Sequence, residues 1–96
     1  MPPPDDISLD SAVRVPLEVM AREVGDETVI LHLASGTYFG LDPVGTRMWA
    51  LIREGLSARE VCRTMLSKYD VEAGQLEADL LSLLRDLREA GLIEIA

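Results

Sequence analysis

His32 and Cys62 are the only side chains in this 96-residue chain that offer an imidazole or a thiol for nucleophilic or metal chemistry. One His and one Cys are too few for a closed zinc site, which takes about four nitrogen or sulfur ligands. Cys62 lies on an apolar stripe, four residues after Ala58 and four before Leu66, where a cysteine behaves as a small hydrophobic residue. His32 falls in the middle of a predicted strand. We therefore predict no catalytic residue, no metal site and no cofactor.

Acidic side chains are plentiful, but their pattern is that of solvated helix faces. The chain has 9 Lys+Arg against 17 Asp+Glu, which gives a net charge of −8. A catalytic carboxyl pair needs a pocket that separates the two pKa values, and the sequence has neither a Gly-rich phosphate loop nor a two-His helix motif. We expect the chain not to be an enzyme. Its acidic balance also argues against nucleic acid as a partner.

The start of the chain is unlike the rest. Residues 1–10 contain three Pro and three Asp, which predicts a flexible tail, and residues 11–96 are long enough for one domain. The N-terminus lacks the basic and apolar regions of a secretory signal, and no apolar run approaches the roughly 20 residues that cross a bilayer. The sequence therefore predicts a cytoplasmic domain with no membrane partner.

Three short strands are predicted at residues 17–24, 27–33 and 37–41. Gly25-Asp26 and Ser35-Gly36 separate them, and two-residue turns would place Val24 opposite Glu27 and Ala34 opposite Thr37. The result is an antiparallel meander. Both of its faces are partly apolar, so the pattern does not indicate which face packs on the helices.

Three helices follow the strands. Asp42, followed by a proline, predicts the start of the first, which ends before Gly55. Ser57 and Glu60 form a capping box at the start of the second, and a third is predicted over residues 72–90. Strands followed by helices indicate an α+β domain: a three-stranded antiparallel meander and then three helices, similar to a winged helix-turn-helix.

Two features are typical of a binding surface. The third strand carries no charge, whereas the first carries Glu18, Arg22 and Glu23, so an edge without charged residues could accept an added strand. Equally, the third helix or the N-terminal segment could cover that edge. Leu81 falls about 140° from the apolar stripe that starts at Leu76, which broadens the apolar face of the third helix. A helix packed on two neighbours would give the same pattern.

An ordered set of motifs spans residues 29–95. It consists of Val29-Ile30-Leu31, Ser35-Gly36-Thr37-Tyr38-Phe39-Gly40-Leu41-Asp42, Gly45-Thr46-Arg47-Met48-Trp49, Gly55-Leu56-Ser57, Tyr69, Asp79-Leu80, Leu87 and Gly91-Leu92-Ile93. This set resembles the PqqD family, which is named after a component of pyrroloquinoline quinone biosynthesis. Asp42 stands where the family often has Asn, and either residue can cap a helix.

The resemblance implies a recognition domain for precursors of ribosomally synthesised, post-translationally modified peptides. The leader segment of the precursor would add as a strand to the third strand and lie in a groove against the third helix. The domain would do no chemistry and would present the precursor to a modifying enzyme: a radical SAM enzyme, a cyclase, or a leader peptidase of a lasso-peptide pathway. The residues implied are Thr37, Tyr38, Phe39, Gly40 and Leu41 at the edge and Asp79, Leu80, Leu83, Leu84 and Leu87 in the groove, to which the helix geometry adds Leu81.

Two other readings remain open from the sequence. The first is a winged-helix DNA-binding regulator, although the third helix offers only Arg85 and Arg88 against five acidic residues. The second is a small self-associating scaffold, a homodimer formed by pairing of the third strand with itself.

Overall fold

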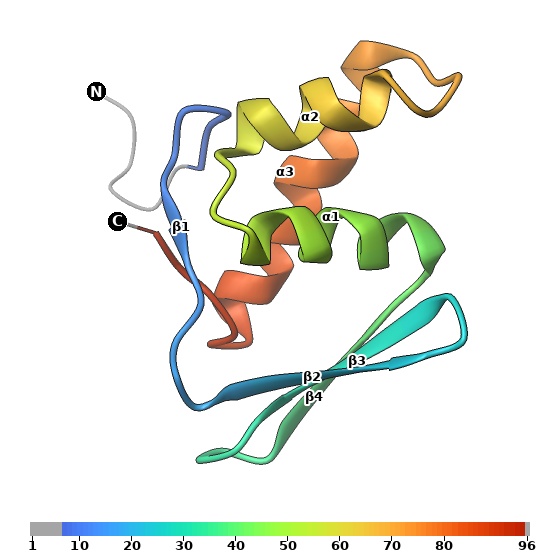
Figure 1. Cartoon of the computed structure of the whole chain (residues 1–96). Coiled ribbons are helices and arrows are strands. Elements are labelled where there is room, and N and C mark those ends of the chain that lie inside the picture. Colours follow the sequence, from blue (N-terminus) through green and yellow to red (C-terminus); the bar gives the residue numbers. More distant parts are fainter. Residues whose placement is uncertain (1–6, 96) are drawn as a thin grey trace.

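The chain folds as a three-stranded antiparallel sheet followed by three helices, which confirms the predicted α+β class (Figure 1). The computed structural model describes residues 7–95. The likeness to a winged helix-turn-helix is loose. The elements, in chain order, are β1 (Val13–Arg14), β2 (Val19–Val24), β3 (Glu27–His32), β4 (Thr37–Leu41), α1 (Pro43–Arg53), α2 (Ala58–Leu66), α3 (Ala73–Glu89) and β5 (Glu94–Ile95).

The main sheet has the strand order β2-β3-β4. Val24 lies opposite Glu27, as the first turn predicted, and Gly25 supplies the positive φ of 65° that this turn needs. The predicted second turn was wrong: Thr37 lies opposite His32, so residues 33–36 form a four-residue loop. The pairing is shifted by two residues. Because side chains alternate with a period of two, the shift leaves every residue on its predicted face.

One face of the sheet packs against the helices and the other does not. Val19, Ile30 and Leu41 are buried on the inner face, where α1 packs against β3 and β4. Met20 and Tyr38 lie on the outer face, and Tyr38 is 71% exposed. Figure 1 shows the helices on one side of the sheet only. The structure therefore decides between the two faces that the sequence left open.

Local capping signals fix the helix starts. The Asp42 carboxylate accepts a hydrogen bond from the Gly45 N–H at 2.7 Å. Both bonds of the predicted capping box form: the Ser57 hydroxyl accepts from the Glu60 N–H at 3.2 Å, and the Glu60 carboxylate accepts from the Ser57 N–H at 3.0 Å. The bond from the Ser57 N–H to the Glu60 carboxylate is the main cause of a lowered pKa of Glu60, and a hydrogen bond with the Ser57 side chain lowers it further. α3 starts after Glu72, whose side chain makes no capping bond.

Residues near both ends of the described chain form a second, smaller sheet. β1 pairs antiparallel with β5, with Val13 opposite Ile95 (Figure 1). Just before β1, residues 7–10 lie in the predicted tail but pack on the domain. Ile7 is 4% exposed, the Arg59 N–H donates to the Leu9 carbonyl at 3.0 Å, and the Arg59 side chain pairs with Asp10. Residues 1–6 of that tail lie outside the described residues.

The core lies between the helices and the inner face of the sheet. The side chains with no exposed surface come from β3, α2, α3 and the segment after α3, namely Ile30, Val61, Leu80, Leu84, Leu87 and Leu92. α3 packs against both α1 and α2, so its inner side is fully used by the core. Among the described residues, no helix is long and apolar enough to cross a membrane.

Candidate functional site

β4 is an edge strand with one side unpaired. In the described part of the chain it pairs only with β3. The register shows which of its backbone groups are free. The Leu33 N–H donates to the Glu18 carbonyl at 2.9 Å, and these two residues continue the β2–β3 register. Because hydrogen-bonding direction alternates along a strand, the odd-numbered residues of β3 bond to β2 and the even-numbered ones to β4.

The even-numbered residues of β3 lie opposite Thr37, Phe39 and Leu41. The backbone N–H and C=O groups of Tyr38 and Gly40 therefore point away from β3, toward the open edge. A Cβ atom built on Gly40 would have no described heavy atom within 4 Å, apart from its chain neighbours. That Cβ would project from the outer face of the sheet. Gly40 itself is exposed, and no described strand pairs with its edge.

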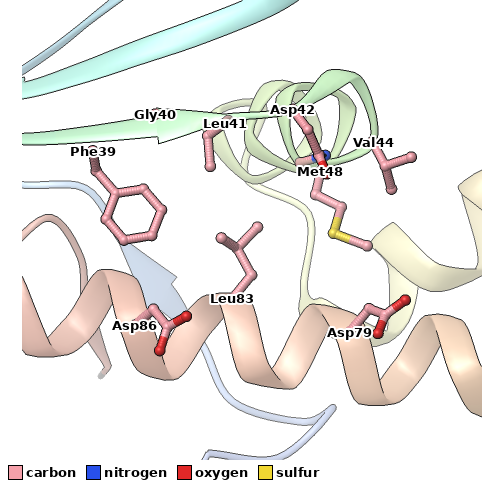
Figure 2. A pocket seen from close by; sticks show the side chains of 10 residues that line it. Phe39, Gly40, Leu41, Asp42, Val44, Met48, Asp79, Leu83 and Asp86 are labelled. Atoms are coloured by element: carbon pink, nitrogen blue, oxygen red, sulfur yellow. The ribbon is translucent and has the colours of Figure 1, made fainter.

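A groove of about 490 Å³ runs beside this edge, between β4, the start of α1 and one side of α3 (Figure 2). Five apolar side chains line it: Phe39, Leu41, Val44, Met48 and Leu83. Three carboxylates join them, from Asp42, Asp79 and Asp86. The groove thus combines an apolar lining with negative charge and lies directly next to the free backbone groups of β4.

The structure brings part of the predicted site together. Phe39, Gly40, Leu41, Asp79 and Leu83 line the groove. Thr37 and Tyr38 belong to the same strand but lie outside the groove, Tyr38 on the outer face. Val44 and Met48 also line the groove and were not among the predicted site residues, although their spacing of four on a helix indicates that both face the same way.

Four leucines of α3 do not line the groove. Leu80, Leu84 and Leu87 are completely buried in the core, beneath the groove-lining residues. At 100° per residue, Leu81 lies about 160° around the helix from Leu83, and it packs against the core on the far side of α3. The resemblance implied Leu80, Leu84 and Leu87 as groove residues, and the helix geometry added Leu81. In this structure all four pack in or against the core.

His32 and Cys62, the two side chains considered for nucleophilic or metal chemistry, do not line the groove. Cys62 is 4% exposed, and burial, with a smaller contribution from the Glu77 carboxylate, raises the pKa of its thiol. The His32 Nδ1 accepts a hydrogen bond from the Ser35 N–H at 3.3 Å in the loop after β3. Between residues 7 and 95, no group of three or more His, Cys, Asp or Glu side chains is placed to hold a metal ion.

Residues 27–93 match the family described as "Coenzyme PQQ synthesis protein D (PqqD)". The chain belongs to the PqqD family. A search of curated protein sequences finds no match to this chain. The matched region begins at β3 and ends after α3, so it contains the β4 edge and the whole groove.

Two solved structures share the PqqD fold of this chain. "TbiB1 in Complex with the TbiA(beta) Leader Peptide" has a TM-score of 0.80 and 40% sequence identity, over 84% of this chain and 94% of that one. "Lasso peptide synthetase B1 complexed with the leader peptide" has a TM-score of 0.78 and 25% identity, over 86% of this chain and 98% of the other. Both relatives were solved with a leader peptide.

Proposed function

We propose that this PqqD-family domain binds the leader segment of a ribosomally synthesised precursor peptide and presents it to a modifying enzyme. The leader adds as a fourth strand to β4, and the alternate side chains that face α3 enter the groove. The domain itself carries out no reaction. We place it in the cytoplasm, where the ribosome releases the precursor.

One observation carries the proposal: the free backbone groups of Tyr38 and Gly40 lie beside an apolar groove. An edge strand alone invites pairing with any extended chain, and natural proteins usually protect it with charge or proline. A groove alone would accept many shapes of ligand. The edge and the groove together fit an extended peptide. Such a ligand gains affinity from main-chain hydrogen bonds and specificity from the pockets for its side chains.

The two relatives support the proposal. Each is a complex with a leader peptide, and each is covered by this chain over almost its full length. Cys62 is not placed to act as a nucleophile, since a reactive thiolate needs an exposed, electropositive setting and this thiol is buried with a raised pKa. The modifying enzyme is a leader peptidase, a cyclase or a radical SAM enzyme. The lasso-peptide relative favours the leader peptidase.

Fluorescence anisotropy tests the proposal directly. The probe is the labelled leader of the short precursor encoded beside this gene, and the controls are an unrelated peptide and a DNA duplex. We expect saturable binding to the leader alone, with a Kd in the micromolar range or below. Binding to none of the three would reject the proposal and favour self-association, which the mass of the protein in solution would then reveal.

A further inference from the structure

The carboxylates of the groove indicate the chemistry of the leader that it accepts. Asp42 lies at the end of β4 and caps α1, whereas Asp79 and Asp86 lie on the side of α3 that faces the groove (Figure 2). All three residues are exposed. In the described part of the chain, the ion pairs join Arg14 to Glu94 and Arg59 to Asp10, and neither pair uses one of the three groove carboxylates.

The three charges are spread along the groove. They do not form a group that could hold a metal ion among residues 7–95. Asp42 uses one oxygen for the Gly45 N–H, and Asp79 accepts a hydrogen bond from the Gln75 side chain at 2.8 Å. Each carboxylate therefore keeps acceptor capacity for a separate donor. Separated negative charges beside an apolar surface match a peptide that alternates between apolar and basic side chains.

The spacing on α3 matches that of a strand. At about 1.5 Å rise per residue, Asp79 lies about 6 Å before Leu83 along the helix axis, and Asp86 lies about 4.5 Å after it. In a strand, two side chains on the same face are about 6.6 Å apart. β4 and α3 run alongside each other on the two sides of the groove (Figure 2). A side chain that contacts Leu83 thus has its i−2 and i+2 neighbours within reach of Asp79 and Asp86.

We propose that the leader segment bound here carries an apolar side chain against Leu83 and a Lys or Arg two residues away on one or both sides. Asp or Glu at those positions is rejected by like-charge repulsion. This inference rests on the proposed function, since it describes the peptide that β4 and the groove bind. It assigns Asp79 and Asp86 as residues that determine specificity.

A displayed library of random peptides about a dozen residues long separates this inference from the proposed function. The library is selected on the wild-type domain and, in parallel, on Gly40→Pro, which removes a backbone donor at the open edge. We expect binders that are lost on Gly40→Pro and are enriched in Lys or Arg at i±2 from an apolar residue. Edge-dependent binders without that enrichment would overturn the inference alone. A selection that yields no edge-dependent binders would overturn the proposed function as well.

A charge-matched pair of variants tests the assigned residues. With one selected peptide as the probe, the double variant Asp79→Asn/Asp86→Asn should raise Kd about fivefold to twentyfold, since an exposed ion pair contributes about a twofold to fivefold change in affinity. The control Glu18→Gln/Glu89→Gln removes the same charge outside the groove and should change Kd less than twofold. Equal losses in both double variants would show a long-range charge effect and overturn the assignment.

Salt and peptide substitution complete the test. Replacing the basic residues of the probe with Gln should weaken binding to the wild type but not to Asp79→Asn/Asp86→Asn, because the two changes remove the same interactions. Raising the salt concentration should also weaken binding to the wild type more than to the variant. Independent, additive losses would contradict direct contact between these side chains.

Discussion

Val29 and Gly40 lie opposite each other in the β3–β4 pair, at a position where the two strands do not exchange backbone hydrogen bonds. The N–H and C=O of Gly40 therefore face the open edge, while its neighbours Phe39 and Leu41 hold β4 in the sheet. The backbone groups of Gly40 are therefore available for peptide binding and are not needed for the pairing of β3 with β4. A change to the Gly40 backbone affects what the edge can pair with and leaves the β3–β4 ladder intact.

Gly40→Pro should abolish leader binding and leave the domain folded. Proline removes the N–H that faces the edge, and an edge strand tolerates proline where that group points to solvent. We expect at least a tenfold loss of affinity by anisotropy and an unchanged far-UV circular dichroism spectrum.

The matched control is Gly40→Ala, which keeps the N–H. The site has open space for the added methyl group and φ lies outside the left-handed region. This variant should bind the leader within about twofold of the wild type. Normal binding by a folded Gly40→Pro variant would contradict strand addition at β4.

Leu83 and Leu84 are neighbours with different tasks. Leu84 is completely buried, so Leu84→Ala should lower the free energy of unfolding by about 2–5 kcal/mol. Leu83 is half-buried and lines the groove, so Leu83→Ala should cost about 1 kcal/mol in stability and about tenfold in leader affinity. Urea unfolding and anisotropy measure the two quantities separately.

Leu81→Ala is the control for this comparison. Leu81 is also half-buried, but it packs on the far side of α3 from the groove. We expect a loss of stability similar to that of Leu83→Ala and no change in leader affinity. A loss of affinity equal to that of Leu83→Ala would show that the groove does not contact the leader.

Thr28→Val should stabilise the domain. Thr28 is 2% exposed, and its hydroxyl has no hydrogen-bond partner among the described residues. Valine has the same shape without the polar group, so we expect a gain of about 1 kcal/mol and a rise in Tm of about 4–8 °C. Ser57→Ala is the contrasting variant, since that hydroxyl caps α2 and its loss should cost about 1 kcal/mol. A lower Tm for Thr28→Val would show that the hydroxyl is satisfied.

The Cys62 thiol should resist alkylation in the folded protein. Burial raises its pKa, so at about pH 8 it reacts with iodoacetamide only after the domain unfolds. Below the ordinary thiol pKa of about 8.5, both the folded and the unfolded state keep the proton, and Cys62 adds no pH dependence to stability. At higher pH the unfolded state loses its proton first, so stability falls.

Cys62→Ala removes this effect, and the pH dependence of its Tm above about pH 8.5 should be flatter than that of the wild type. Leader binding should be unchanged. Mass spectrometry detects the label. Rapid alkylation of the folded wild-type protein by iodoacetamide would contradict a buried, neutral thiol.

Features with a local cause could be predicted from the sequence. Asp42 and the Ser57–Glu60 capping box mark helix starts through contacts within three residues, and the Gly25 turn fixes the β2–β3 register. The four-residue loop after His32 was missed because Ser35-Gly36 fits a two-residue turn equally well. The packing of Ile7 was missed because the proline-rich composition before it suggested a tail for the whole stretch.

The groove was only partly predictable for a different reason. The absence of charge on β4 follows from the composition of one strand, but that composition left open whether another element covers the edge. The contribution of α3 depends on how the helix is rotated about its own axis against the sheet, which is a tertiary property. The rotation of α3 about its axis places Asp79, Leu83 and Asp86 in the groove lining and directs the fully buried leucines into the core. Apolar residues dominated the sequence signal, so Asp86 was not included in the predicted site.

The outer face of the sheet, where Met20 and Tyr38 are exposed, gives the proposed complex a second surface that another protein can contact. A strand added to β4 directs every second side chain into the groove and the others to this outer face. The two sets of leader positions then have separate tasks. Substitutions at the positions that enter the groove change the affinity for this domain. Positions on the outer face stay accessible to a second protein, and substitutions there do not release the peptide.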